Sequence, residues 1–368
     1  MAAVRGTKND VKSRQGTVPR RVAFMREALL LLLITVGFPG VSAAEPPTPA
    51  RIKLATLIPR GTPPYEVLME MREKWRQAPE GGVELVVYPD GTMGGEADMV
   101  RRMRVGQIQA AMLSMNGLAG IDKSINALQD MPMMFRSLDE VEYVRGKMRP
   151  VLEKHLAERG FVALFWGDMG WVRFFSKDAA AHPTQFMRMK LFTWAGDNEQ
   201  LDLMKGMGFN AVPLETADIL PGLQTGLINA VDTAPLYALA GQFYGPCPHM
   251  LELNYAPLGG ATVITQKAWE SLPAAAQQVL LSTAGEAGAE ITRRSRTESD
   301  QAVEAMKKRG LTIQPATPEI EAEWRALAEG IYPKIRGSMV PEAEFDEVRR
   351  LLNEYRKTAP ASRGGYSK

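Results

Sequence analysis

The sequence predicts an α/β fold built of two lobes. Residues 51–114 and residues 190–231 each show the order strand, helix, strand, helix, strand, which is typical of parallel sheets covered by helices. The third observation is a helical pattern over residues 272–309, which is longer than most helices of globular domains. We expect this long helix to lie across both lobes.

The first lobe begins with an alternating strand at residues 51–57 and a loop rich in Pro and Gly. An amphipathic helix is expected at residues 65–77. Further strands are expected at residues 83–88 and 110–114, with a helix over residues 98–106 between them. Ser137 fits a helix N-cap position, and Glu140 completes a capping box.

Two apolar strands connect the predicted lobes. Residues 161–166 form a buried strand that continues at residues 173–176, and a strand that passes between lobes acts as a hinge. A strand at residues 260–264 returns the chain to the first lobe. The expected boundaries are residues 45–168 and 260–357 for the first lobe and residues 169–259 for the second.

The second lobe is expected to contain strands at residues 191–194, 209–214 and 228–231 and a helix at residues 217–225. Gly226 ends that helix, where a positive φ costs glycine little. Ligands of parallel sheets bind beyond the carboxyl ends of the strands, so we look for a site there.

Candidate ligand-binding residues lie at these strand ends and along the hinge. They are Tyr65, Asn116, Asp168, Trp171, Arg173, Phe192, Trp194, Asp197, Asp232, Thr233 and Tyr237. Asp197 also fits a helix N-cap with no further role, and core packing is an equal interpretation of Phe192. Asp168 and Asp232 are expected either to bind the ligand or to hold neighbouring backbone.

The composition excludes several classes of protein. The 368 residues carry a net charge of +2 and no long basic stripe in the mature chain, which argues against a nucleic-acid partner. Cys247 is the one cysteine and the three histidines lack ligand spacing, so no metal and no cofactor are indicated. We expect no enzyme, because the sequence has neither a nucleophile elbow nor an HExxH motif. An exported enzyme and a ligand-sensing receptor remain the alternatives.

The N-terminus has the pattern of a secretory signal. Arg20, Arg21 and Arg26 precede an apolar run at residues 28–41, and small residues follow at 41–44. We expect residues 1–44 to be cleaved and the mature protein to lie in the periplasm. Arg20 and Arg21 also fit a twin-arginine signal in place of the general secretion route, and Met25 is an alternative start. Residues 358–368 are expected to form a disordered tail.

Four short motifs occur in a specific order behind this signal. They are YPDGTMGGE at residues 88–96, MRVGQIQAA at 103–111, LQTG at 223–226 and KAWESLP at 267–273. With them the chain resembles the solute receptors, or P subunits, of tripartite ATP-independent periplasmic (TRAP) transporters of the DctP type. The resemblance implies a type II-like periplasmic-binding-protein fold whose lobes close over a small organic molecule. It also implies delivery to a small and a large membrane subunit, and in a similar subgroup a helical-repeat periplasmic partner.

The sequence departs from the family pattern where the ligand is bound. Phe192 stands where the family has an arginine that grips a ligand carboxylate, and Asp232 and Thr233 replace a Glu-Asn pair. Arg173 is the candidate substitute for the missing charge. The expected ligand is therefore an organic acid or related metabolite that is partly apolar.

Overall fold

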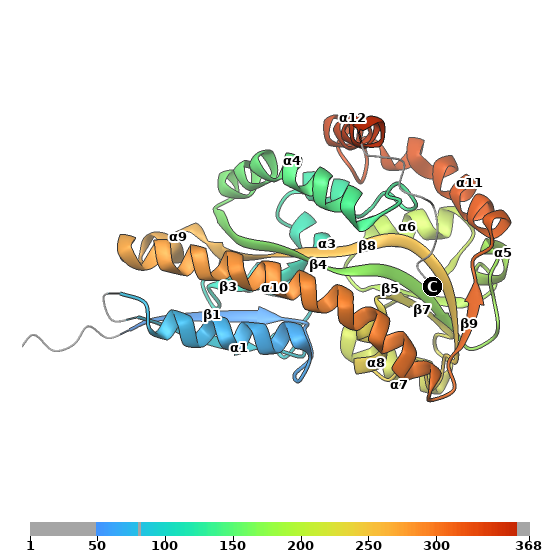
Figure 1. The fold of residues 1–368 in the computed structure, drawn as a ribbon, viewed down its shortest axis with the longest axis horizontal. Coiled ribbons are helices and arrows are strands. Elements are labelled where there is room, and N and C mark those ends of the chain that lie inside the picture. The colour runs from blue at the N-terminus through green and yellow to red at the C-terminus, as the bar shows by residue number, and fades with distance from the viewer. Residues whose placement is uncertain (1–48, 80–81, 359–368) are drawn as a thin grey trace, which may run out of the picture. The chain divides into compact units, whose positions relative to one another are not determined.

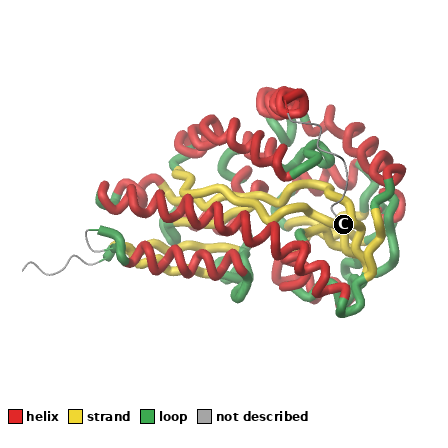
Figure 2. Tube along the Cα trace, in the orientation of Figure 1, coloured by secondary structure: helices red, strands yellow, loops and turns green. Residues whose placement is uncertain are grey.

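The computed structural model describes residues 49–79 and 82–358. The expected signal, residues 1–44, lies outside the described residues, as do residues 359–368 of the expected tail. Figure 2 shows the strands running through the middle of the described chain, with helices on either side. Among the described residues, no helix combines the length and apolar character that a bilayer crossing requires.

The first lobe is built on three parallel strands. In chain order its elements are β1 (Ala50–Thr56), α1 (Pro63–Arg76), β2 (Val83–Tyr88), α2 (Glu96–Arg104) and β3 (Ala110–Ser114). β1 lies between β2 and β3 and pairs with both in parallel. The predicted alternation of strands and helices in this lobe is confirmed.

The second lobe repeats this arrangement. Its elements are β5 (Lys190–Trp194), α6 (Asn198–Gly206), β6 (Asn210–Leu214), the 3₁₀ turn η2 (Thr216–Asp218), α7 (Ile219–Thr225) and β7 (Ala230–Thr233). β5 pairs in parallel with β6 and β7. Gly226 follows α7 with φ of 75°, as predicted. β7 extends through Thr233, so Asp232 and Thr233 are its last residues and do not lie beyond it.

Two long antiparallel strands join the lobes. β4 (Phe161–Ser176) forms a continuous strand where the sequence indicated two pieces, and β8 (His249–Thr265) begins earlier than predicted. In the described residues they complete one nine-stranded sheet of order β2-β1-β3-β8-β4-β7-β5-β6, with β9 (Thr312–Pro315) attached to β8. The β4–β8 register shifts at three places, one of them between Asp168 and Trp171.

Adjacent residues of the strands pack on opposite faces of this sheet. Leu191 and Ala230 belong to one buried cluster of the second lobe, whereas their neighbours Phe192 and Val231 belong to another. Side chains of a strand alternate in direction, so each lobe has a core on both faces. This alternation fixes which residues face the region between the lobes.

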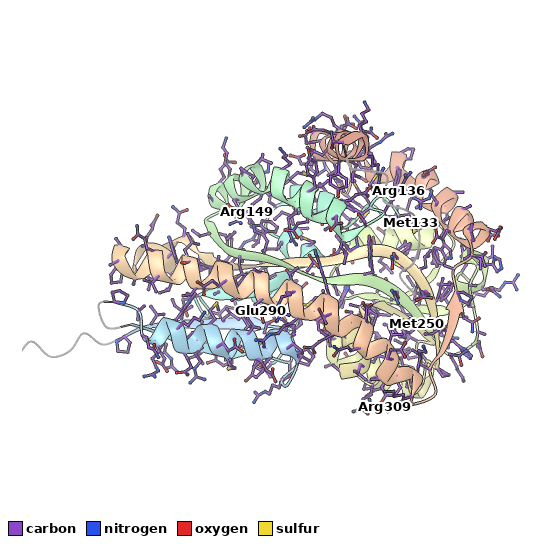
Figure 3. The ribbon with its side chains drawn as sticks, viewed as in Figure 1. Met133, Arg136, Arg149, Met250, Glu290 and Arg309 are labelled. Atoms are coloured by element: carbon purple, nitrogen blue, oxygen red, sulfur yellow. The ribbon has the colours of Figure 1, made fainter. Side chains whose placement is uncertain are left out.

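The long helix is confirmed as α10 (Ala274–Lys307), with 34 residues. It packs on α1, on β4 and on α8 (Pro235–Ala240), and so contacts both lobes (Figure 1). Glu290 lies near its middle and Arg309 just past its end (Figure 3). Gly288 brings it close to the sheet, since a Cβ there would lie 2.8 Å from the Phe165 Cβ and the Trp166 carbonyl oxygen.

The remaining helices cover the sheet and the loops. They are α3 (Met115–Ala119), η1 (Lys123–Leu128), α4 (Leu138–Glu158), α5 (Pro183–Phe186), α9 (Gln266–Glu270), α11 (Pro318–Ile335) and α12 (Glu342–Thr358). Ser137 caps α4 as predicted, because its hydroxyl accepts a hydrogen bond from the Glu140 N–H. The Glu140 carboxylate accepts a hydrogen bond from the Arg136 N–H and not from the Ser137 N–H. The second hydrogen bond of the predicted capping box is therefore made one residue earlier.

α11 packs in both lobes: Ile320, Trp324 and Ala328 lie in a second-lobe cluster, and Ile331 and Ile335 lie in a first-lobe cluster. Its Trp324 is fully buried and stacks on Phe174, with ring centroids 4.8 Å apart. The Trp324 indole donates a hydrogen bond of 2.8 Å to the Ala181 carbonyl. β9 likewise pairs with β8 beginning at His249, in the second-lobe part of that strand.

Candidate functional site

A cavity of about 410 Å³ lies where the strand ends of the two lobes meet. Its wall includes Thr56 at the end of β1, Ser114 at the end of β3, Trp194 at the end of β5 and Thr233 at the end of β7. The middle parts of β4 and β8 complete the wall between them. The carboxyl ends of parallel strands therefore converge on one site, as expected for this sheet topology.

Aromatic side chains form much of the cavity wall. Phe192 and Trp194 meet edge to face, with ring centroids 5.0 Å apart. Phe192 is only 2 % exposed and packs in the second-lobe core. It is therefore both a core residue and part of the cavity wall. Tyr237 from α8 and Tyr255 from β8 add their rings to the lining. The site is thus suited to a ligand with a substantial apolar part.

Four acidic side chains line the same cavity. They are Glu96, Asp130, Asp168 and Asp232. Burial raises the pKa of Asp232 to about 6. Burial, with repulsion from Asp197 and Glu199, raises the pKa of Asp130 to about 8. Among the described residues, no arginine, lysine or histidine lines the cavity.

Asp168 lines the cavity and also holds neighbouring parts of the fold, which is one of the two roles expected of it. The carboxylate is 1 % exposed and accepts a hydrogen bond of 3.0 Å from Arg145. Arg296 of α10 adds two more, of 2.8 and 2.7 Å. With both oxygens held by two guanidinium groups, this carboxylate ties β4 to α4 and α10.

Asn116 and Asp197 form a contact between the lobes. The Asn116 amide, which lines the cavity, donates to the Asp197 carboxylate at 3.2 Å. Asp197 also caps α6 by accepting from the Gln200 N–H at 2.9 Å, so the N-cap interpretation is correct. Asp197 itself does not line the cavity. Its second role, as a lobe-to-lobe contact, is not visible in the sequence.

Further contacts close the entrance beside this pair. Lys123 of the first lobe forms an ion pair with Glu199 of the second. A Cβ on Gly95 would lie 2.4 Å from the Glu215 carboxylate, so only glycine fits here without a shift of Glu215. The structure therefore shows the lobes in contact around the cavity.

Besides Asp197, three predicted site residues lie outside the cavity wall. Tyr65 is in the first turn of α1, where it packs against the core between α1, α10 and the sheet. Trp171 packs against a first-lobe core cluster. Arg173 lies 3.9 Å from Glu252, and its buried Nε has no hydrogen-bond partner among the described residues. Neighbouring residues of β4 differ in direction, which explains why Val172 lines the cavity and Trp171 and Arg173 do not.

The remaining predicted residues are brought together as expected. Asn116, Phe192, Trp194, Asp232, Thr233 and Tyr237 all line the cavity, and their contact with a ligand stays a prediction. Sequence reasoning missed Asp130, Glu96 and Tyr255. Asp130 precedes the Met-rich segment 131–134, and an acidic residue at the start of an apolar loop was the signal that was available.

The family model for bacterial extracellular solute-binding proteins, family 7, the DctP family, matches residues 54–337. The chain belongs to this family. TRAP solute-binding proteins have two-lobed periplasmic-binding-protein folds, and this chain shares that fold.

Two curated relatives align with most of this chain and with most of their own length. The 2,3-diketo-L-gulonate-binding periplasmic protein YiaO of Escherichia coli is 26% identical over 241 residues, covering 64% of this chain and 71% of YiaO. The C4-dicarboxylate-binding periplasmic protein DctP of Rhodobacter capsulatus is 20% identical over 289 residues, covering 78% and 86%.

Solved structures of family members superpose on most of the chain. The sugar acid binding protein DctPAm of Advenella mimigardefordensis, in complex with galactonate, matches with a TM-score of 0.78 and 15% identity, covering 83% of this chain and 99% of that one. A TRAP periplasmic solute-binding protein of Shewanella oneidensis with bound succinate has a TM-score of 0.77 and 18% identity, with 83% and 100% covered.

Proposed function

We propose that this family 7 protein is the solute receptor of a TRAP transporter and binds a small, partly apolar organic acid or related metabolite without changing it. The observation that carries the proposal is the cavity of about 410 Å³ between lobes that already touch through Asn116 and Asp197. A cavity of this size suits a small metabolite, and its aromatic wall suits an apolar part. The relatives whose ligands are named bind organic acids, which agrees with the expectation of an organic ligand.

Capture requires the lobes to separate and close again. The connections between them in the sheet are the long strands β4 and β8, whose pairing is irregular between Asp168 and Trp171. An interrupted ladder bends more readily than a regular one, so we place the hinge there. Closure makes the Asn116–Asp197 hydrogen bond and excludes water from the aromatic wall. The ligand thereby stabilises the closed state, and its release accompanies opening.

Two reactive groups, Asp168 and Cys247, are in states that disfavour turnover. Asp130 and Asp232 have raised pKa values, and the test for conversion of the bound molecule decides on them. Asp168 is neutralised by two arginines. The Cys247 thiol is fully buried, donates to the Asn229 carbonyl at 3.6 Å and has its pKa raised to about 12 by burial. Neither group is in a state suited to acid–base or nucleophilic chemistry.

The cellular setting and the lobe boundaries are part of the proposal. The signal-like residues 1–44 support export to the periplasm, where the loaded receptor would meet the small and large membrane subunits or a helical-repeat partner. We place the first lobe at residues 45–168 and 260–357 and the second at residues 169–259. Residues 312–328 are the exception within the first range: we assign them to the second lobe, because Trp324 and Ala328 pack there, whereas Ile331 and Ile335 pack in the first-lobe core.

The experiment is recovery of the natural ligand. The receptor is purified from its own periplasm without denaturation and analysed by native mass spectrometry, and small-angle scattering is recorded before and after removal of the bound molecule. We expect one small molecule per chain and a smaller radius of gyration in the loaded form. Conversion of the molecule to a product by the receptor, or a receptor that never carries one, would contradict the proposal.

A further inference from the structure

The acidic lining of the cavity differs in how well its members are satisfied. Asp168 is held by Arg145 and Arg296. Glu96 accepts hydrogen bonds from the Ser114 N–H at 2.6 Å and from the Ser114 hydroxyl at 2.5 Å. These two carboxyl groups therefore have their partners within the protein.

Asp130 and Asp232 have no such partners. Within the described residues, no other residue donates a hydrogen bond to either carboxyl group, and Asp232 receives one only from its own backbone. No basic side chain of the described residues lines the cavity. The two groups nevertheless line the same cavity, together with Tyr255. Both residues are only partly exposed. A carboxyl group shielded from water without a donor is costly, and a bound ligand is the remaining source of one.

We propose that Asp130 and Asp232 form the polar recognition point of the cavity and that the ligand presents to them a hydrogen-bond donor, either an ammonium or a hydroxyl group. This inference rests on the proposed function, since it names the ligand chemistry of the same cavity. A ligand carboxylate placed there would meet the negative charge of Asp232, whose pKa of about 6 leaves it ionised at pH 7.5, with no counter-ion from the wall. An ammonium group has three N–H donors and can satisfy both acidic groups, whereas a hydroxyl group has one donor and can satisfy one of them.

The rest of the wall fits the same ligand. Phe192, Trp194 and Tyr237 surround the cavity with aromatic rings. Aromatic faces attract an ammonium group as well as apolar carbon, so the amine form gains from the wall in both ways. The alcohol form gains only the apolar contact. The ratio of the affinities for an amine and an alcohol is therefore measurable, and it shows which group supplies the donor.

The test uses three probes that share a six-carbon chain: hexylamine, hexan-1-ol and hexanoate. Each is titrated by calorimetry into the ligand-free receptor at pH 7.5. We expect hexylamine, hexan-1-ol or both to bind at least tenfold more tightly than hexanoate. Preference for hexylamine over hexan-1-ol identifies an ammonium ligand, and equal binding identifies a hydroxyl. Hexanoate binding as tightly as the other two would overturn the inference.

Matched variants locate the effect. Asp232→Asn and Asp130→Asn should each weaken hexylamine binding at least tenfold, whereas Asp202→Asn removes a charge from the exposed face of α6 and should change nothing. Equal binding by all of these proteins would overturn the assignment of the two carboxyl groups. The probe series on the unaltered receptor decides the matter even if a variant fails to fold.

The molecule recovered from the native receptor separates this inference from the proposed function. A recovered amine or alcohol supports both, and it decides the outcome if the probes bind weakly. A recovered carboxylate that has no amino or hydroxyl group leaves the receptor function standing and overturns only the donor inference. Absence of any bound molecule, together with no probe binding, counts against both.

Discussion

The side-chain amide of Asn116 donates a hydrogen bond of 3.2 Å to the carboxylate of Asp197 across the two lobes. Gln129 in turn donates to the Asn116 carbonyl oxygen at 3.3 Å, which fixes the orientation of the amide. A residue of the first-lobe helix α3 is thus oriented to meet the N-cap of a second-lobe helix. The predictions begin with this pair because it exists only while the lobes are together.

Asn116→Ala should weaken binding of the natural ligand about fivefold, because one partly buried hydrogen bond contributes about 1 kcal/mol to the closed state. Lys123→Ala is the matched control, since it removes the exposed ion pair with Glu199 at the same entrance and exposed pairs contribute little. Calorimetric affinity is the measurement, with scattering to confirm a more open ligand-free population in Asn116→Ala. Equal losses in the two variants would show that Asn116 has no special role in closure.

Asp168→Asn should destabilise the fold by about 3–5 kcal/mol, because it leaves the guanidinium groups of Arg145 and Arg296 without their shared carboxylate. Urea unfolding at neutral pH measures the change. Arg293→Ala breaks an ion pair with Glu290 on the exposed side of the same helix and should leave the midpoint unchanged. A midpoint for Asp168→Asn equal to that of the unaltered protein would mean that the buried network is not stabilising.

Two glycines of α10 should respond oppositely to alanine. Gly288→Ala places a methyl group 2.8 Å from Phe165 and should destabilise by about 1–3 kcal/mol. At Gly285, one turn earlier, no atom lies within 4 Å of the added Cβ, so alanine should stabilise the helix by about 0.5–1 kcal/mol. Denaturant melts of both variants test this. If both changes have the same sign, close packing of α10 on β4 is not the reason for Gly288.

Stability of the ligand-free receptor should fall as pH rises from about 4 to about 8. The pKa of Asp130 is raised from 3.8 to about 8 in the fold, so the folded state holds this proton more tightly than the unfolded chain. That stabilisation is complete below the unfolded pKa and is lost as pH approaches the folded pKa. Asp232, whose pKa is raised to about 6, adds to the loss only between about pH 4 and pH 6.

Calorimetric melting temperatures of Asp130→Asn and Asp232→Asn check this pH dependence. The melting temperature of Asp130→Asn should depend less steeply on pH up to about pH 8, and that of Asp232→Asn only up to about pH 6. Measurements at constant ionic strength are needed, because surface charges respond to salt. Slopes that match the unaltered protein in both variants would show that these carboxyl groups titrate normally.

Local sequence patterns predicted the local elements well. The alternation of β1, α1 and β2, the helix α10 and the stop at Gly226 all follow from periodicity and from glycine at a positive φ. β8 was predicted only from residue 260, because Pro257 and Gly259 in its first part are unusual inside a strand. Hydrogen bonds to β4 along its length stabilise this strand. That pairing joins residues far apart in the chain.

The site was predicted less well because its chemistry depends on distant partners. Asp168 resembled a cleft carboxylate until the fold placed Arg296, 128 residues away, against it. Asp130 gained its role only when the fold brought it into the same cavity as Asp232 and Tyr255. Residue type and strand position identified the wall of the cavity, whereas the pairing of charges required the tertiary structure.

The strands β4 and β8 have a consequence for how the receptor folds. Each contributes hydrogen bonds to the ladders of both lobes, so neither lobe can lose its structure without removing partners from the other. Calorimetry should therefore show a single cooperative transition in place of two separate domain melts. A severed lobe should not fold alone. Opening of the proposed hinge between Asp168 and Trp171 should therefore bend one folding unit and not separate two independently folded domains.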